Sequence, residues 1–280
     1  MSLRINQNID AFNSYRNLSV TQGEMSKSLE KLSSGFRINR AADDAAGLAI
    51  SETLRSQVGG LKVAVRNAQD GVSVAQTAEG ALTEVHSMLQ RMRDLAVQAS
   101  NEGANGGNSG AAVGAIQKEV DSLVDAIDKI ATTTQFNGVK LLDGTAGTGG
   151  LITFQVGANA GETQDITTQD MQAAALGIDA LDFTSGAGAA STAISTIDTA
   201  IASVSDYRAS LGAAQNTFEH TVANLNVAVE NLSASESRIR DTDMAQEMMN
   251  FTRSQILSQA GTAMLAQANQ APQGVLQLLR

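Results

Sequence analysis

The sequence predicts a mainly α protein: a long antiparallel coiled-coil helical bundle with a small β-hairpin region, in which the N- and C-terminal helices pair. First, apolar or alanine residues recur three or four positions apart from Leu54 to Ala99 with no charge among them, which places them on one helix face. Second, the only proline is Pro272 and no tryptophan or cysteine is present, which suits long helices with an aliphatic core. A helix over 54–99 would be roughly 70 Å long, more than a compact domain of 280 residues needs.

The first helix follows from a sparse apolar pattern that runs from Leu3 to Phe36. Gly35 and the segment 39–44 interrupt that pattern and predict a joint before the long helix. Either Asp43 or Asp44 is expected to cap that helix or to lie in its first turn, where a carboxylate satisfies free backbone N–H groups.

The middle of the chain begins with a glycine- and asparagine-rich turn at 101–110. A second apolar series from Val113 to Ile130 predicts a helix that folds back antiparallel on the first. The period then changes, because a Phe-Asn-Gly turn signal at 136–138 precedes strand-like alternation at 152–156. We expect one or two β-hairpins over 139–157 and short irregular structure over 158–189.

The C-terminal half mirrors the N-terminal half. A third apolar series over 190–232 predicts a second long helix, a joint follows at 237–243, and a last helix from Met244 leads toward Pro272. We therefore expect one domain from 1–42 with 237–280, and a helical rod over 43–236 that includes a β region at 136–185.

The apolar stripes indicate self-association, because a thin alanine-rich bundle cannot bury all of them within one molecule. Heterologous contacts that do not close would make a filament. The net charge of −10 argues against a nucleic-acid partner, which requires a basic face. No run of 18 apolar residues predicts membrane insertion, and the first 17 residues lack the apolar stretch of a cleavable signal peptide.

The sequence contains no recognisable pattern of catalytic residues. The two histidines, His86 and His220, stand without a partner at metal-ligand or general-base spacing, and the glycine-rich segments lack the Lys-Ser/Thr of a phosphate loop. We therefore expect no enzyme activity, no metal and no cofactor.

A dense polar patch lies at 90–98 on the long helix. Arg91 and Leu95 are four residues apart and share a face that is offset from the apolar stripe. The patch is either a solvated face with one stray leucine or a contact surface, and spacing alone does not separate these two interpretations.

Specific motifs across nearly the whole chain, except about 145–190, resemble those of short bacterial flagellins. They are LEKLSSG at 29–35, NRAADDAAGLAI at 39–50, QTAEGAL at 76–82, FNG at 136–138, LLDG at 141–144, SRIRD at 237–241, AMLAQAN at 263–269 and VLQLLR at 275–280.

The resemblance implies a structural subunit that polymerises into the extracellular bacterial flagellar filament, the helical propeller of swimming cells. The terminal helices would form an inner tube, and the rod an outer tube. Export would follow the flagellar type III pathway. The implied partners are other subunits, cap and hook-junction proteins, an export chaperone, the export apparatus and host innate immune receptors.

The resemblance also implies roles for particular residues. Axial subunit contact and recognition by a Toll-like receptor would fall on Gln90, Arg91, Arg93, Asp94, Leu95 and Glu119. Filament-core assembly and chaperone contact would fall on Leu29, Leu32, Phe251, Ile256, Met264, Leu265, Leu276, Leu278, Leu279 and Arg280. Two alternatives stay open: a hook–filament junction protein, which shares such termini, and a cytoplasmic coiled-coil scaffold.

Overall fold

The computed structural model describes the backbone of residues 7–101, 111–147, 149–185 and 187–278, and the side chains of these residues except 187 and 271–278. The chain divides into two compact units. Unit 1 comprises the described parts of 1–57 and 230–280, and unit 2 comprises those of 58–229. The division falls within two continuous helices, so the predicted domain boundaries at 42/43 and 236/237 stay a prediction.

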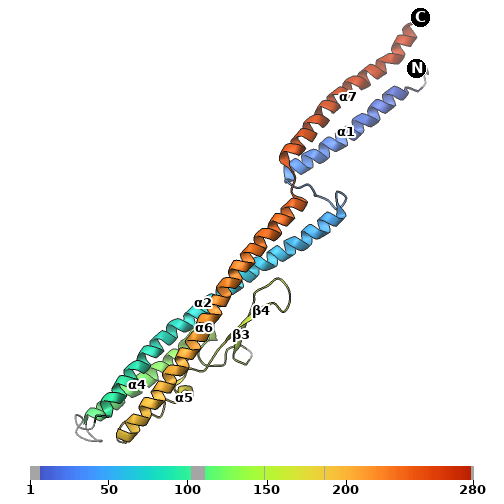
Figure 1. Cartoon of the computed structure of the whole chain (residues 1–280). Coiled ribbons are helices and arrows are strands. Elements are labelled where there is room, and N and C mark those ends of the chain that lie inside the picture. The colour runs from blue at the N-terminus through green and yellow to red at the C-terminus, as the bar shows by residue number, and fades with distance from the viewer. Residues whose placement is uncertain (1–6, 102–110, 148, 186, 279–280) are drawn as a thin grey trace. The chain divides into compact units, whose positions relative to one another are not determined.

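The long helices confirm the predicted fold class (Figure 1). The main helices are α1 (Ile9–Ser34), α2 (Ala45–Ala99), α4 (Ala111–Thr133), α6 (Ala187–Arg240) and α7 (Met244–Leu278). The apolar stripe from Leu54 to Ala99 lies within the single helix α2, as expected. The last helix extends further than the sequence suggested, because α7 continues past Pro272.

Unit 1 contains the paired terminal helices α1 and α7, which lie side by side (Figure 1). Helix α1 begins at the N-cap Asn8, whose Oδ1 accepts a hydrogen bond from the N–H of Ala11. The Asn8 amide also donates to the carbonyl of Ala268 on α7 at 2.7 Å. The start of α1 therefore lies beside the C-terminal part of α7, as the predicted pairing requires.

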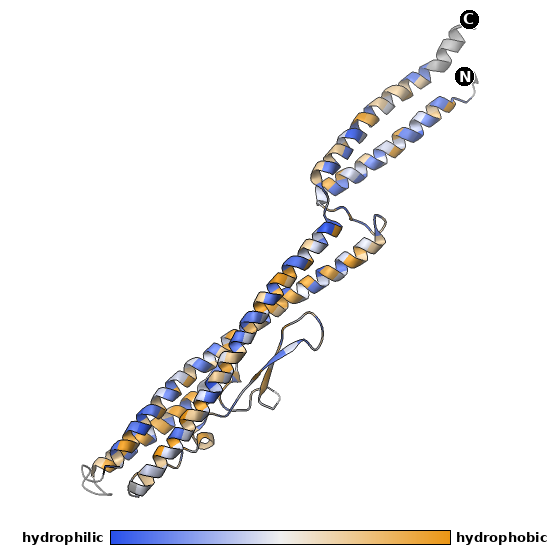
Figure 2. Cartoon of the chain, viewed as in Figure 1, coloured by the Kyte–Doolittle hydropathy of each residue, from blue (hydrophilic) through white to orange (hydrophobic). Residues whose placement is uncertain are grey.

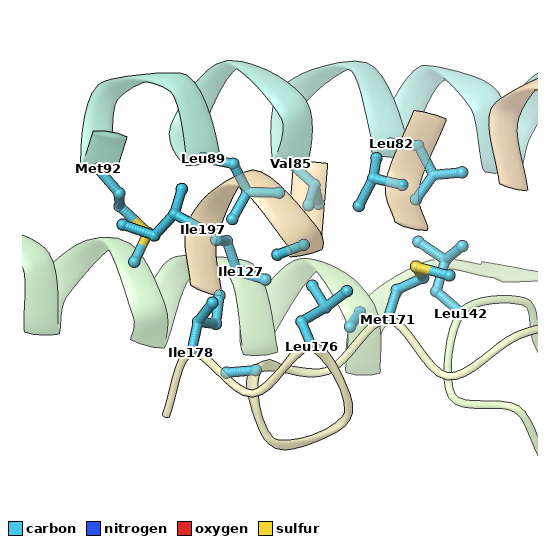
Figure 3. Close-up of a cluster of buried hydrophobic side chains, with 14 of the residues drawn as sticks. Leu82, Val85, Leu89, Met92, Ile127, Leu142, Met171, Leu176, Ile178 and Ile197 are labelled. Carbon is cyan, nitrogen blue, oxygen red and sulfur yellow. The ribbon is translucent and has the colours of Figure 1, made fainter. Parts of the chain in front are cut away.

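Unit 2 holds one aliphatic core between α2, α4 and α6 (Figure 3). Leu82, Val85, Leu89 and Met92 of α2 face Ile127 of α4 and other apolar side chains, and all five are fully buried. Burial of such a stripe stabilises the helices, because each fully buried aliphatic side chain contributes about 1.5–3 kcal/mol.

Apart from Gln135, the β strands lie within the predicted β region at 136–185, and they extend beyond the hairpins expected over 139–157. Strands β1 (Gln135–Phe136) and β2 (Val139–Lys140) form a short hairpin, and β3 (Leu151–Gln155) pairs antiparallel with β4 (Thr163–Thr167). The expectation of only irregular structure over 158–189 is wrong, since it missed β4 and the one-turn helix α5 (Ala173–Leu176). Strand β4 buries only Ile166, so its threonine- and glutamine-rich sequence carries little alternation.

The first hairpin follows the Phe-Asn-Gly signal closely. Asn137 and Gly138 both have positive φ, at 49° and 82°. A two-residue turn with positive φ at both positions matches the twist of the flanking strands, and asparagine and glycine tolerate that conformation best.

Candidate functional site

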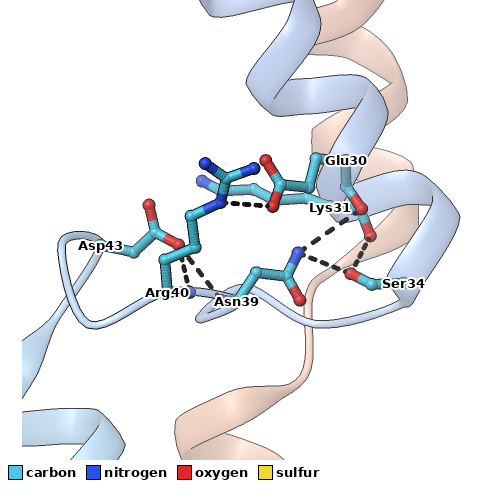
Figure 4. A network of polar contacts seen from close by, with 6 residues as sticks. All are labelled: Glu30, Lys31, Ser34, Asn39, Arg40 and Asp43. Atoms are coloured by element: carbon cyan, nitrogen blue, oxygen red, sulfur yellow. Dashed lines mark hydrogen bonds and ion pairs between the residues drawn. The ribbon is translucent and has the colours of Figure 1, made fainter.

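The joint between α1 and α2 is held by side-chain capping (Figure 4). Asp44 caps α2, because its Oδ1 accepts the N–H of Gly47 at 2.8 Å. Asp43 Oδ2 accepts the N–H groups of Arg40 and Asn39 at 3.0 and 3.1 Å. These two hydrogen bonds hold the pKa of the Asp43 carboxyl below its usual value, and the hydrogen bond from Arg40 has the larger effect. Sequence analysis left the N-cap open between the two aspartates, and the structure assigns it to Asp44.

A second joint lies beside the first within unit 1. The Arg37 N–H donates to the Arg240 carbonyl at 2.6 Å, and the Thr242 N–H donates to the Gly35 carbonyl at 3.0 Å. The Arg240 guanidinium lies 4.8 Å from the centre of the Phe36 ring and 2.7 Å from Glu52 Oε1. Asp243 then caps α7 by accepting the N–H of Ala245 at 2.9 Å. The two joints tie α1 and α7 together at one end.

The side chains buried most completely in the seam between α1 and α7 are small or polar, whereas larger apolar ones of the same helices, such as Leu32, Phe251 and Leu265, are only half-buried. Ser28, Glu247 and Ser254 are buried there, and Leu18 packs on the backbone of Gly261. In a coiled coil such positions are usually filled by large aliphatic side chains. The terminal pair therefore buries little apolar surface between its own helices.

Many large apolar side chains of α1 and α7 are exposed instead. Phe12 is 72% exposed and Met264 63% exposed, far above the value for core residues. Figure 2 shows hydrophobic residues along both helices. We call this surface the outward terminal face; its exposed members are Ile9, Phe12, Tyr15, Val20 and Leu29 on α1, and Met248, Met249, Ile256, Leu257 and Met264 on α7.

The residues predicted for filament-core assembly divide into three groups. Leu29, Ile256 and Met264 belong to the outward terminal face, whereas Leu32, Phe251 and Leu265 are half-buried in unit 1. Leu276 and Leu278 lie in α7, but their side chains are outside the described set, and Leu279 and Arg280 lie outside the described residues.

The polar patch on α2 bridges to both neighbouring helices. Arg91 pairs with Glu119 of α4 at 2.7 Å, and Arg93 pairs with Asp198 of α6 at 2.6 Å. The hydrogen bond that Arg93 donates to the Asp198 carboxylate raises the pKa of the Arg93 guanidinium. Gln90, Arg91, Arg93, Asp94 and Glu119 are all exposed. Exposed ion pairs of this kind are worth about 0–1 kcal/mol, so these groups can exchange partners at little cost.

Leu95 does not belong to the exposed surface of the predicted patch. The expectation that it lies open beside Arg91 is wrong, because its side chain is only 2% exposed. Helix α2 packs against both α4 and α6, so its buried band is wide enough to include Leu95 beside Met92 and Ala96. Leu95 therefore lies in the core beneath the exposed residues of the patch.

Two polar residues of α4 hold the return segment that leads from β4 to α6, and sequence analysis missed both. The Gln117 side chain donates to the Leu181 carbonyl at 2.8 Å and accepts the Phe183 N–H at 2.9 Å. Asp128 Oδ1 accepts the N–H of Ala173 at 2.7 Å. In the sequence, Gln117 and Asp128 have the polar character of solvent-exposed helix residues, so their role becomes visible only from their tertiary contacts.

Metal-binding groups and membrane-spanning helices are not found in the part of the chain that the structure describes. No cluster of three or more His, Cys, Asp or Glu side chains there could hold a metal ion. Within the same residues no helix combines the length and hydropathy needed to cross a bilayer.

Comparison with known proteins gives matches along the whole chain. The family model for the bacterial flagellin N-terminal helical region matches residues 5–147, and that for the C-terminal helical region matches residues 194–279. Flagellin of Halalkalibacterium halodurans is 55% identical over 278 residues, which cover 99% of each chain. Flagellin of Bacillus subtilis is 51% identical over 99% of this chain and all of that protein.

Two solved structures share the fold. The crystal structure of Bacillus cereus flagellin covers 57% of this chain and 88% of its own, with 36% identity and a TM-score of 0.50. A putative flagellar hook-associated protein from Vibrio parahaemolyticus has a TM-score of 0.58 and covers 71% of this chain and all of its own, but its 16% identity indicates the fold alone. The hook–filament junction alternative is therefore not favoured. The chain belongs to the bacterial flagellin family, and it is a structural subunit that polymerises into the extracellular flagellar filament.

Proposed function

We propose that copies of this chain associate through the outward terminal face, and that this face forms the inner tube of the filament. The observation that carries the proposal is the burial pattern of α1 and α7, in which the fully buried positions are small or polar and the ten large apolar side chains of the face are exposed. Exposed apolar surface of this extent typically marks a protein–protein contact.

The energetics favour association over an isolated terminal pair. Each large apolar side chain of the face gains about 1.5–3 kcal/mol when a neighbour buries it fully. The seam gains less, since its fully buried positions hold two serines and a glutamate, and its apolar side chains, such as Leu32 and Phe251, are only half-buried. Neighbouring copies present the same face, so its helices complete their packing only in the polymer.

A matched pair of substitutions tests the outward terminal face. Ile256→Asp places a charge on it, whereas Gln255→Asp places the same charge one residue earlier, on another exposed part of α7. Elongation of filament seeds by purified monomer should fall at least tenfold for Ile256→Asp and change less than twofold for Gln255→Asp, because a buried unpaired carboxylate is costly. Equal elongation by both variants would exclude this face from assembly.

The exposed members of the α2 patch are proposed as a second contact surface. Gln90, Arg91, Arg93 and Asp94, together with Glu119 of α4, would meet an adjacent subunit in the filament and a Toll-like receptor in the monomer. The Arg91–Glu119 ion pair presents both charges on one surface, 2.7 Å apart, and both side chains are roughly half exposed. Exchange of this pair for contacts with a partner costs little free energy.

Measurement of receptor affinity tests whether this surface, and not another exposed part of α2, makes the contact. Arg91→Ala should weaken binding of the monomer to the receptor ectodomain by roughly tenfold or more, as expected for a central arginine contact. Arg66→Ala removes an exposed arginine from the same helix outside the patch and serves as the control. Equal affinities of the two variants would remove Arg91 from the contact.

The remaining partners are proposed from family membership and from α7. A cytoplasmic export chaperone would cover the outward terminal face of α7 before export, together with Leu276, Leu278, Leu279 and Arg280 at the C-terminus. The type III apparatus would export the chain, and cap and hook-junction proteins would contact the filament ends.

Chaperone-bound monomer should not elongate seeds, and Ile256→Asp should weaken the chaperone complex as well. Elongation by the intact complex would contradict shared use of α7.

A further inference from the structure

Exposed methionine is concentrated on one helix. Met92 and Met171 are buried in unit 2, and Met25 and Met88 are half-buried. The four methionines of α7 are 47–63% exposed: Met244, Met248, Met249 and Met264. Because the chain has no cysteine, methionine supplies all of its sulfur.

Two of these methionines share an apolar groove. Met248 and Met249 line it with Thr252, Arg253, Ile256 and Leu257, and Arg253 is its only charged lining residue. A spacing of seven residues, or two helical turns, places Met249 on the same helix face as Ile256, and Met248 lies beside them. Met244 and Met264 are similarly exposed but do not line the groove.

We propose that Met248 and Met249 form a reversible oxidation site that controls whether a monomer can join the filament; this inference rests on the proposed role of the outward terminal face. The oxidant is hydrogen peroxide or another two-electron oxygen donor. The Sδ atom attacks one peroxide oxygen, the S–O bond forms and the O–O bond breaks. The departing hydroxide takes the proton of the transferred oxygen and leaves as water. Methionine is oxidised by two electrons and peroxide is reduced.

Oxidation changes the chemistry of the groove. A thioether is flexible and apolar, whereas a sulfoxide is polar and accepts hydrogen bonds. Beside Ile256 and Leu257 a sulfoxide oxygen would be buried on assembly without a donor, which penalises association. A thiol-dependent methionine sulfoxide reductase reverses the change: two thiols become a disulfide, and the oxygen leaves as water.

The test compares two double variants of the full chain. Wild type, Met248→Leu/Met249→Leu and Met244→Leu/Met264→Leu are each treated with limiting peroxide, and seed elongation is compared with that of untreated monomer of the same variant. The treated-to-untreated ratio should fall at least tenfold for wild type and for the Met244/Met264 variant. It should fall much less for the Met248/Met249 variant, because leucine cannot form a sulfoxide and the remaining exposed methionines lie outside the groove. Peptide mass spectrometry should find oxygen on Met248 and Met249 before Met92 and Met171, and reductase treatment should restore elongation.

Several outcomes overturn the inference. Undiminished elongation by oxidised wild type, equal sensitivity of both double variants, or no recovery after reduction would each exclude the oxidation site while leaving the proposed assembly face intact. Failure of untreated wild type to elongate seeds would overturn the proposed assembly face, and the oxidation site with it.

Discussion

At the scale of single residues, Leu95 is a buried side chain that can affect the α2 patch only through the stability of the core. It lies under the α2 patch, within the core formed by α2, α4 and α6. Substitution at this position would change recognition of the patch through loss of stability, whereas substitution of Arg91 would change a direct contact.

Leu95→Ala should lower the free energy of unfolding by about 2–5 kcal/mol, because it removes buried methyl groups and leaves a cavity. Val97→Ala, at an exposed position two residues away, should stay within about 0.5 kcal/mol of wild type. Urea unfolding of both variants gives the comparison. A stability loss below about 1 kcal/mol for Leu95→Ala would contradict its place in the core.

Asp43 makes the joint sensitive to acid. The hydrogen bonds from the N–H groups of Arg40 and Asn39 hold its pKa in the folded chain below its usual value, so the ionised form stabilises the fold. This contribution is fully present above the unfolded-chain pKa and disappears as the pH falls through the folded pKa. The stability difference between wild type and Asp43→Asn should therefore shrink when urea unfolding is moved from about pH 6 to about pH 3. Asp125→Asn removes an exposed carboxylate of α4 and serves as the control. A difference independent of pH would contradict the capping role.

At the scale of elements, the β3–β4 hairpin depends on close packing against the long helices. The Phe154 and Phe218 rings meet edge to face at 5.5 Å, and a Cβ at Gly71 of α2 would lie 2.8 Å from the Phe218 ring. Asn67 of α2 also donates to the Gln155 carbonyl at 2.9 Å. Gly71 therefore serves close approach of an aromatic ring, although glycine disfavours a helix.

Gly71→Ala should destabilise unit 2 by about 1–3 kcal/mol through overpacking against Phe218. Gly80→Ala in the same helix meets no atom within 4 Å and should stabilise the chain by about 0.5–1 kcal/mol through helix propensity. Thermal unfolding should lower the Tm of the first variant and raise that of the second. Stabilisation by both substitutions would show that Phe218 does not need this space.

Sequence periodicity predicted the helices well, because a three-to-four spacing maintained over many turns has no other physical interpretation. It failed where tertiary contacts decide the outcome. Strand β4 is held by pairing with β3, and the return segment by Gln117 and Asp128, which look solvated in sequence. The burial of Leu95 depends on α2 having two helical neighbours. The polar seam of α1 and α7 was likewise hidden, since a sparse stripe does not tell which face meets the partner helix.

At the scale of the whole molecule, the two units differ in how they satisfy their apolar residues. Unit 2 buries its large side chains internally in one core, whereas the terminal pair of unit 1 exposes its own. This contrast explains how a chain of the flagellin family can fold its rod as a monomer and still have a driving force for polymerisation. The outward terminal face is the central element of that account.

The most direct test is a helical reconstruction of the filament by electron microscopy, at a resolution that places side chains. Phe12, Tyr15, Ile256 and Met264, all strongly exposed in the single chain, should be buried against neighbouring subunits. Ser28 and Ser254 should remain in the seam of their own subunit. A filament in which these four apolar side chains remain open to solvent, while subunits meet through other surfaces, would contradict the account.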